Sequence, residues 1–225
     1  MTGPTAVAGA AICAPLRVEQ VALRGARAQV VRTGMGRRRS IRSARRLDGR
    51  PVLVAGVAGG LAADVRPGDI VVATEVRGPD GGRVNCPSAA LLAAELRRLG
   101  LHIHCGPIAS SRRLLDGAGR RKLAGAGALA VDMESVWLAP AADAGSPFAV
   151  VRAISDTERE PMLRPGIVSN GIAALRSLRQ AVPALDAWAA AVGQLTRPEP
   201  ESDLDPNRTR TPPEPHAAKA RRQRR

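Results

Sequence analysis

Short apolar segments alternate with amphipathic segments along almost the whole chain, and this alternation limits the possible folds more than any other feature. In RPGDIVVATEV (66–76), for example, Pro67 and Gly68 form a turn, and Asp69 opens an apolar run. Strands that alternate with helices are typical of a mostly parallel sheet with helices on both faces. The sequence therefore predicts an α/β fold of three layers, in which helices flank a central, mostly parallel or mixed sheet.

The pattern also predicts where the elements lie. Pro140 is expected to end or kink the helix that follows Glu134, because proline disrupts a helix interior. We expect strands at about 5–12, 28–33, 51–57, 69–76, 102–109, 128–133 and 148–155, and helices at about 16–24, 37–48, 87–100, 117–125, 134–144 and 168–192.

Length and charge indicate one domain followed by a tail. The chain has 225 residues and a net charge of +14, and such a length can bury a sizeable core. We expect the domain in residues 1–195 and a disordered, Pro-rich, basic tail in residues 196–225. Positive charge attracts anionic membranes and nucleic acids, so weak contacts of the tail with such partners are one hypothesis. The alternative, which we favour, is a solvated extension with no partner.

The cysteines and histidines give no sign of a metal site or a disulfide framework. Cys13, Cys86 and Cys105 are odd in number and lack CxxC spacing, which favours a reducing compartment. The segment HIHC places His102 and His104 on one face of a strand. A metal site is one hypothesis for them, but without a further ligand cluster we favour two partly exposed histidines. We therefore expect no metal and no other cofactor.

The N-terminal segment AVAGAAICAPL (6–16) has some features of a signal peptide. It lacks the basic region that precedes the apolar part of such peptides. We therefore interpret it as a first buried strand, followed by a turn at Pro15. The chain also contains no apolar run of the roughly 20 residues that a membrane helix needs. We expect a cytoplasmic protein.

Polar or glycine-rich segments follow most of the predicted strands. Ligands of such sheets bind beyond the carboxyl ends of the strands, so we expect these segments to meet at one edge and form a site. They are Glu19 in the first helix, TGMGR (33–37), GVAGG (56–60), ASSRRLL (109–115), DMES (132–135) and RAISD (152–156).

Two carboxylates in these segments are candidates for chemistry. Glu134 and Asp156 each end a strand, and a single helix separates the two strands, so they are expected to face one cavity. Glu19, after the first strand, is a third candidate. An acid at such a position often caps a helix or a turn instead, and this is the alternative for Glu134 and Asp156. Their combination with two glycine-rich segments favours a site.

The glycines of TGMGR and GVAGG allow two interpretations. Gly34 and Gly36 flank Met35 before a basic helix, and exposed N–H groups at such a turn can hold an oxygen-rich ligand. The alternative is close packing of a strand against a helix. The same two interpretations apply to the glycines of the second segment, Gly56, Gly59 and Gly60.

The segments VAGVAGGLAADVRPGDIVVATEV, AVDMES and FAVVRAISD, in this order, resemble the purine nucleoside phosphorylase/nucleosidase superfamily. The resemblance spans about residues 5–192. It is nearest to the methylthioadenosine/adenosylhomocysteine nucleosidases and to the hopanoid-associated phosphorylases, which are thought to remove adenine from adenosylhopane. CAPLRVE and TGMG carry the likeness to the second branch. The resemblance implies a nucleoside phosphorylase-like fold and a homo-oligomer, a dimer or larger.

The resemblance also assigns roles to the ribose and nucleophile sites. It implies that Glu134 accepts hydrogen bonds from the 2′ and 3′ hydroxyls of the ribose, which a carboxylate can do simultaneously. It implies that Met133 packs against the sugar and that Asp132 supports this arrangement. Glu19 matches the family's early glutamate, which positions or deprotonates the attacking water.

At the base, Asp156 matches the acid that protonates N7, and for this role it must carry a proton at neutral pH, which burial favours. Arg152 and Ser155 are expected to orient Asp156, and Leu114 and Leu115 to border the base. The remaining predicted binding residues are Val57, Ala58 and Gly59 in GVAGG, and Gly34, Met35 and Gly36 in TGMGR.

The resulting hypothesis is hydrolysis of the N-glycosidic bond of an adenine nucleoside with a modified 5′ position, such as adenosylhopane. One alternative is phosphorolysis. Phosphorylases of this superfamily typically have a phosphate-binding serine where Val57 stands, which argues against it, whereas Arg37, Arg38 and Arg39 argue for it. Another alternative is a non-catalytic module that binds nucleosides or nucleic acid. The presence of all three acids disfavours this last possibility.

Overall fold

The computed structural model describes residues 9–47, 49–142, 145–158 and 167–195. The predicted tail and residues 5–8 of the first predicted strand lie outside this part of the chain. The strands are β1 (Ala11–Ala14), β2 (Gln29–Arg32), β3 (Val52–Gly60), β4 (Ile70–Arg77), β5 (Arg83–Asn85), β6 (Ile103–Ser110), β7 (Ala130–Asp132) and β8 (Phe148–Asp156). The helices are α1 (Arg17–Ala22), α2 (Arg37–Ala44), α3 (Ala89–Arg98), α4 (Gly117–Gly125), α5 (Ser135–Leu138), the 3₁₀ helix η1 (Ala139–Ala141), α6 (Ile167–Gln180) and α7 (Val182–Leu195).

The strands form one mixed sheet in which parallel pairs predominate. Its order is β2-β1-β3-β7-β6-β4-β5, and β8 pairs with both β3 and β4. The pairs β3–β7, β4–β5 and β4–β8 are antiparallel, and the others are parallel. Because β8 joins β3 to β4 on one side and β7–β6 joins them on the other, these strands close a ring. The predicted fold class is confirmed.

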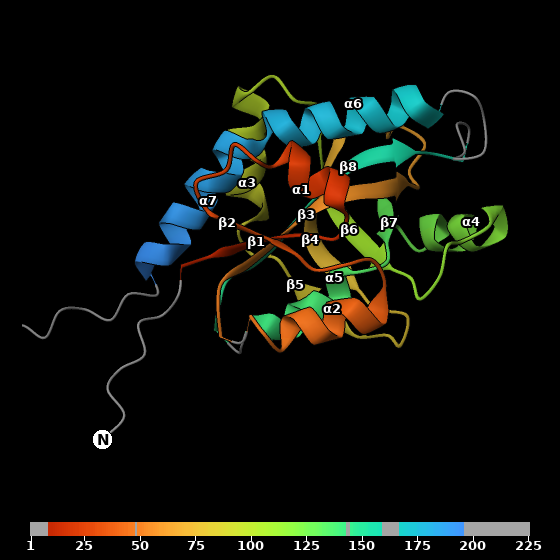
Figure 1. Ribbon diagram of the computed structural model, residues 1–225. Helices are drawn as coiled ribbons and strands as arrows, with labels where there is room; N and C mark the ends of the chain where they lie inside the picture. Colours follow the sequence, from red (N-terminus) through yellow and green to blue (C-terminus); the bar gives the residue numbers. More distant parts are fainter. Residues whose placement is uncertain (1–8, 48, 143–144, 159–166, 196–225) are drawn as a thin grey trace, which may run out of the picture.

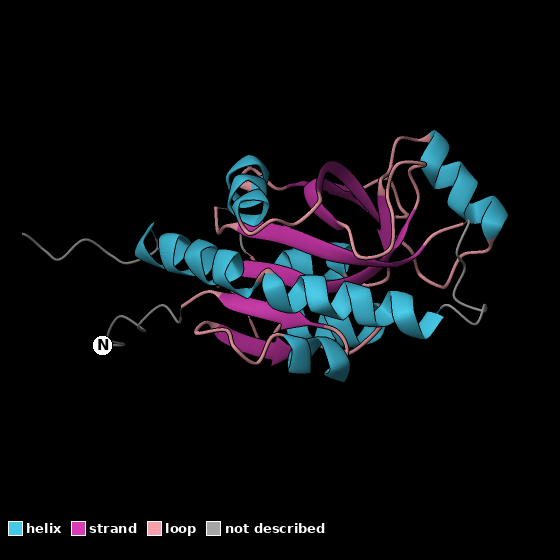
Figure 2. Cartoon of the chain, turned by 90° about the horizontal axis from the view of Figure 1, so that it is seen from above, coloured by secondary structure: helices cyan, strands magenta, loops and turns pink. Residues whose placement is uncertain are grey.

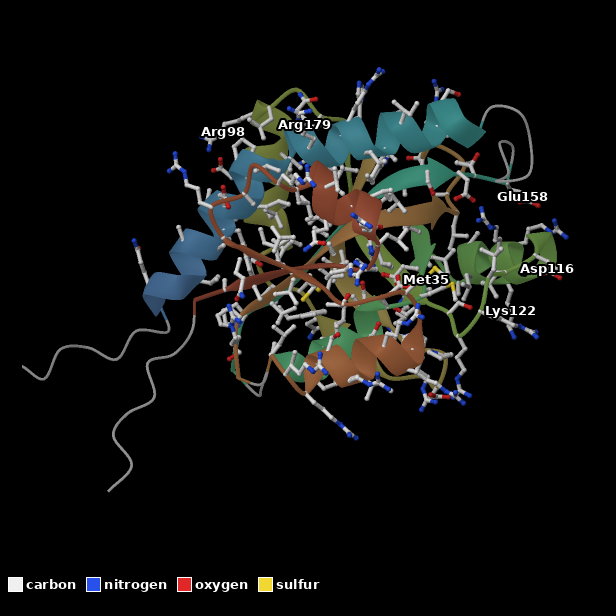
Figure 3. The ribbon with its side chains drawn as sticks, in the orientation of Figure 1. Met35, Arg98, Asp116, Lys122, Glu158 and Arg179 are labelled. Carbon is white, nitrogen blue, oxygen red and sulfur yellow. The ribbon has the colours of Figure 1, made fainter. Side chains whose placement is uncertain are left out.

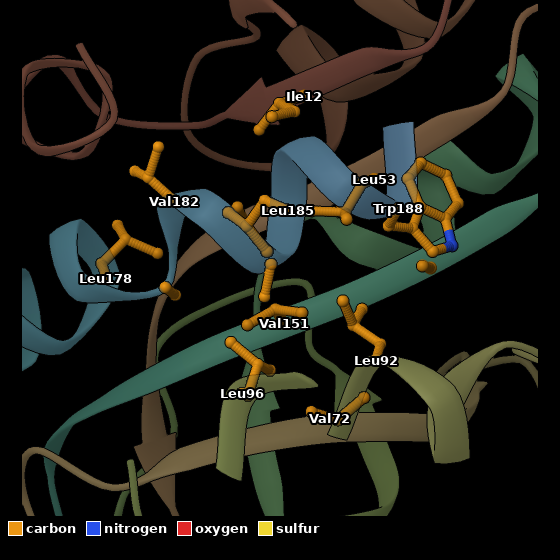
Figure 4. Close-up of a cluster of buried hydrophobic side chains, with 14 of the residues drawn as sticks. Ile12, Leu53, Val72, Leu92, Leu96, Val151, Leu178, Val182, Leu185 and Trp188 are labelled. Carbon is orange, nitrogen blue, oxygen red and sulfur yellow. The ribbon is translucent and has the colours of Figure 1, made fainter. Parts of the chain in front are cut away.

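Helices cover both faces of the sheet (Figures 1 and 2). Successive side chains of a strand point to opposite faces, so Leu53 of β3 belongs to one core and Val54 to the other. The first core lies under α1, α3, α6 and α7, and Figure 4 shows Leu92 of α3 and Leu185 and Trp188 of α7 gathered there. The second lies under α2, α5 and η1. Both cores consist mainly of aliphatic side chains.

Two prolines set the limits of helices. The segment predicted as one helix at 168–192 forms two helices. The first, α6, ends at Gln180, and Pro183 lies in the first turn of the second, α7. Proline fits there since the first N–H groups of a helix have no partner within it. The predicted end of a helix at Pro140 is confirmed, because α5 has four residues and Pro140 lies in the 3₁₀ helix that follows.

Two strands differ from the prediction. Strand β5 was not predicted; it follows a tight turn in which the N–H of Gly78 donates to the carbonyl of Gly82 at 2.7 Å. Strand β3 continues through the whole of GVAGG (56–60), so this segment is not a loop. The prediction that GVAGG follows the strand is wrong, and its glycines lie within the sheet.

The basic cluster in and after α2 lies on the outer face of that helix. Arg37, Arg38 and Arg39 are exposed, whereas Ala44 and Leu47 are buried in the second core. The apolar residues of the segment therefore form its inner face. The three arginines therefore point away from the sheet.

Candidate active site

A pocket lies at the carboxyl ends of several strands, as the alternation predicts. Figure 3 labels Met35, which lies at its mouth with an exposed side chain. The lining comes from segments far apart in the sequence, since each follows or ends a different strand. The lining residues are Pro15, Leu16, Glu19, Met35, Val57, Ala58, Gly59, Arg113, Leu114, Leu115, Arg120, Val131, Asp132, Met133, Glu134, Ser155 and Asp156.

The floor of the pocket rests on a buried ion pair between Arg152 and Asp132. The Arg152 side chain is completely buried in β8, and its Nη2 lies 2.7 Å from Oδ2 of Asp132. Asp132 also accepts hydrogen bonds from the hydroxyls of Ser110, at 2.6 Å, and Ser135. Burial alone would raise the pKa of Asp132, but Arg152 and these hydroxyls outweigh it and lower the pKa. Asp132 is therefore a fixed anion that anchors Arg152.

Glu134 lies beside this pair and faces the pocket. Its Oε1 accepts a hydrogen bond from the N–H of Gly36 at 2.9 Å, and its Oε2 lies 3.5 Å from Nη2 of Arg152. Glu134 occupies the N-cap position of α5, but its side chain makes no capping hydrogen bond. The N–H groups of Glu134 and Ser135 donate to Asp132 instead. The capping alternative for Glu134 is therefore wrong, and its carboxylate is available to a ligand.

Glu19 reaches the same cluster from α1. Its Oε1 accepts from the N–H of Val57 at 2.7 Å, and its Oε2 from the N–H of Leu16 at 2.5 Å. The side chain is almost completely buried. Burial raises the pKa of Glu19, and burial raises the pKa of Glu134 too, although Arg152 opposes both shifts. Three carboxylates thus share one buried guanidinium, so the cluster carries excess negative charge when all are ionised.

Asp156 has a different partner at the other side of the pocket. Its Oδ2 forms an ion pair with Nη2 of Arg120 from α4, and its Oδ1 accepts from the hydroxyl of Ser155 at 2.8 Å. The hydrogen bond from Ser155 is consistent with the prediction that this residue orients Asp156. The prediction that Arg152 orients Asp156 is wrong, since the contacts of Arg152 are with Asp132 and its neighbours. Arg120 pairs with Asp156 instead. Its position next to Arg121 in GAGRRKL did not predict this contact.

The glycines of β3 allow other side chains to approach the strand closely. A Cβ on Gly56 would lie 2.6 Å from both Arg152 Nη1 and Glu19 Oε1, and one on Gly59 would lie 2.7 Å from Arg120 Nη2. The close-packing interpretation of these glycines is therefore confirmed. In TGMGR, Gly34 and Gly36 have positive φ of 81° and 85°, a conformation that favours glycine.

Most of the predicted binding residues line the pocket, and the exceptions lie behind it. Gly36 holds Glu134 through its N–H, and Gly34 packs against the side chain of Arg39. Leu115 is half-buried in the lining, whereas the side chain of Leu114 is mostly exposed. Arg37, Arg38 and Arg39 are not part of the lining. These three arginines therefore supply no positive charge to the pocket, whose lining arginines are Arg113 and Arg120.

Two other features of the described residues lie outside this pocket. His104 lies 2.9 Å from Asp69, and Cys105 is exposed. No group of three or more His, Cys, Asp and Glu side chains in the described ranges is arranged to hold a metal ion. A larger cavity lies near the amino ends of β1 and β2, but Asp186 there already accepts from the N–H groups of Arg27 and Ala28.

A comparison with protein families identifies the family of this chain. The family described as the Phosphorylase superfamily matches residues 13–182. The chain belongs to the Phosphorylase superfamily. The resemblance inferred from the motifs is thus confirmed. The matched region includes every residue that lines the pocket.

Solved structures share the fold of this Phosphorylase superfamily member at low sequence identity. A 5′-methylthioadenosine nucleosidase mutant of Helicobacter pylori with 5′-methylthioadenosine in its active site has a TM-score of 0.68 and 19% identity, covering 80% of this chain and 98% of its own. The futalosine hydrolase of H. pylori has a TM-score of 0.65 and 20% identity, and the match covers 81% of this chain and 97% of that one. The S-adenosylhomocysteine nucleosidase of Streptococcus pyogenes has a TM-score of 0.64 and 22% identity, and the match covers 82% of this chain and 99% of that one.

Proposed function

We propose that this protein hydrolyses the N-glycosidic bond of a purine nucleoside. The observation that carries the proposal is the convergence of Glu19, Glu134 and Asp156 on one pocket. Glu19 comes from α1, Glu134 follows β7, and Asp156 ends β8. Breaking this bond passes through an oxocarbenium-like state, in which the sugar gains positive charge. The buried carboxylates around Arg152 supply negative charge where that state would form.

Each acid has a distinct task in the proposed reaction. Glu134 accepts the ribose hydroxyls, and the half-buried thioether of Met133 packs against the sugar. Glu19 takes a proton from the attacking water, whose oxygen forms the new bond to C1′. The C1′–N9 bond breaks, and its electron pair stays with the base. Asp156 takes up a proton from solvent before the reaction and delivers it to N7. The products are the free base and the free ribosyl compound.

The arrangement supports water rather than phosphate as the nucleophile. Glu19 and Glu134 are buried in the pocket, and a phosphate dianion beside these carboxylates would be repelled. Val57 offers no hydroxyl to a phosphate oxygen. The arginines after Gly36 point outward and so do not offset the repulsion. Phosphorolysis is therefore the less favoured reaction.

The substrate is proposed to be an adenine nucleoside with a modified 5′ position. The names of the similar structures support this class, since two of them are nucleosidases of methylthioadenosine or S-adenosylhomocysteine. CAPLRVE and TGMG extend the proposal to adenosylhopane. A non-catalytic binding module is disfavoured, because such a module would not need a general base and a general acid in one pocket.

Three further properties belong to the proposal. A homo-oligomer, a dimer or larger, would cover exposed apolar side chains such as Val18 and Val21 of α1. The basic tail would contact anionic membranes or nucleic acid weakly. The three cysteines, all free, support a cytoplasmic location. Separately, none of the described helices has the length and hydrophobicity to cross a membrane.

The proposed activity is tested by incubating the purified protein with a panel of purine nucleosides and following the free base by chromatography. We expect base release by the native protein. Asp156→Asn should fold normally and lose roughly 10² to 10⁴ in rate, the usual contribution of general acid catalysis. Base release at the native rate by a folded Asp156→Asn protein would refute the role of Asp156. No release from any nucleoside would refute the function.

A further inference from the structure

Arg120 has a buried N–H group that nothing in the described part of the chain uses. Its residue is 9% exposed, and it lines the pocket beside Asp156. Its Nη2 pairs with Asp156, but its Nη1 has no hydrogen-bond partner among the described residues. Buried polar groups are nearly always hydrogen-bonded, so an unpaired guanidinium N–H beside a ligand pocket points to a partner on the ligand.

The neighbouring residues hold the guanidinium at the pocket. Gly59 lacks a side chain, and a Cβ there would lie 2.7 Å from Nη2 and 3.3 Å from Nη1 of Arg120. Helix α4, which carries Arg120, lies at the edge of the molecule and contacts β7, the strand that leads to Glu134 (Figure 1). The guanidinium thus lies over the end of β3, on the side of the pocket where Asp156 lies.

We propose that Arg120 is a second catalytic group at the base, which donates a hydrogen bond from Nη1 to an acceptor atom of the leaving purine. This inference rests on the proposed function. When the C1′–N9 bond breaks, its electron pair moves onto the base, and the acceptor atoms at the base edge become more negative. A guanidinium stays protonated in proteins, so Arg120 stabilises this charge without giving up a proton. The proton itself still comes from Asp156.

The test compares two leaving groups in the full-length protein. A purine base needs activation before it leaves, whereas 4-nitrophenolate is a stable anion that leaves without it. Arg120→Met removes the guanidinium and keeps an unbranched side chain of similar length. We expect it to lose roughly 10²-fold in kcat on a purine nucleoside, as for the loss of one charge-stabilising donor. The rate on 4-nitrophenyl β-D-ribofuranoside should change little.

Arg121 provides the matched control on the same helix. Its side chain is exposed and pairs with Glu158, which Figure 3 shows near α4. Arg121→Met should retain the native rate on both substrates. Gly59→Ala is a second probe that leaves Arg120 in the sequence, because its Cβ displaces only the flexible end of that side chain. It should fold normally and lose more rate on the purine nucleoside than on 4-nitrophenyl β-D-ribofuranoside.

Three outcomes would overturn the assignment of Arg120. One is an unchanged or faster purine rate in Arg120→Met while the native protein is active, which would show that Asp156 acts alone. Another is an equal loss on both substrates, which would indicate a structural role only. The third is a native protein that releases no base from nucleosides at all, which removes the proposed function as well. The first two leave the proposed function intact.

Discussion

Arg152 is the residue on which the acidic half of the site depends. It is fully buried and lies among Asp132, Glu134 and Glu19, so each carboxylate is held by a charge that solvent does not screen. The motif RAISD suggested that Arg152 serves Asp156 instead. The structure differs because β8 carries one extra residue at Ser155, where the pairing with β3 shifts. Such a bulge interrupts the alternation of side chains between the two faces of the strand. No pattern in the sequence predicts it.

At the same scale, Glu134→Gln should weaken catalysis without unfolding the protein. The amide oxygen of glutamine can still accept the N–H of Gly36, and the native side chain does not cap α5. A neutral acceptor replaces a charged one for the ribose hydroxyls, and such bonds are worth about 1.5–3 kcal/mol. We expect kcat/KM to fall roughly ten- to a hundredfold with little change in Tm. A lower Tm with native kinetics would contradict the ribose-binding role.

The pH dependence of the reaction follows from Glu19 and Glu134. Both act as carboxylates, so both must be ionised, and activity must fall as the pH is lowered through their pKa values. Burial raises the pKa of each above the usual value of 4.5. The acid limb of kcat/KM should therefore lie above pH 4.5. A profile of kcat/KM that is flat from neutral pH down to 4.5 would show that neither group must lose a proton.

At the scale of elements, β3 is the strand around which the site is built. It pairs with β1, β7 and β8, and it lies against Glu19, Arg152 and Arg120. Small residues in GVAGG make these approaches possible. The sequence predicted a strand that ended at about residue 57, because glycine usually weakens a strand. Pairing on both sides extends β3 to Gly60.

Gly56→Ala tests this close approach. The added Cβ would lie 2.6 Å from both Arg152 Nη1 and Glu19 Oε1, so it must push apart two groups that attract each other. Overpacking of a dense core typically costs about 1–3 kcal/mol. We expect a lower free energy of unfolding in denaturant titrations and a reduced kcat. Gly171→Ala in α6, where an added Cβ would meet no atom within 4 Å, serves as the control. Native stability and kcat in Gly56→Ala would contradict the packing described.

At the scale of the whole molecule, the sequence predicted the layers, nearly every strand and most of the pocket lining. These features could be predicted because the alternation of apolar strands with amphipathic helices indicates which face of each element is buried. The sequence did not predict the pairing of Arg120 with Asp156, since that contact joins α4 to β8 across 36 positions. Nor did it predict β5, whose three residues include only one apolar side chain.

The tail is predicted to be dispensable for chemistry. Its proline and charge content cannot form a core, and the pocket lining lies entirely between residues 15 and 156. A protein that ends at Thr196 should retain its kcat on a soluble nucleoside. It should lose affinity for anionic vesicles or nucleic acid, with the largest loss at low salt. A large fall in kcat after truncation would show that the tail contributes to the site.

The most direct test of the central claim is the dependence of base release on phosphate. The purified protein is incubated with its best purine nucleoside in buffer with and without inorganic phosphate, and the sugar product is identified by mass spectrometry. With Glu19 as the base for water, the rate should be the same in both buffers, and the product should be the free ribosyl compound. A strict requirement for phosphate, with the ribosyl 1-phosphate as product, would contradict hydrolysis.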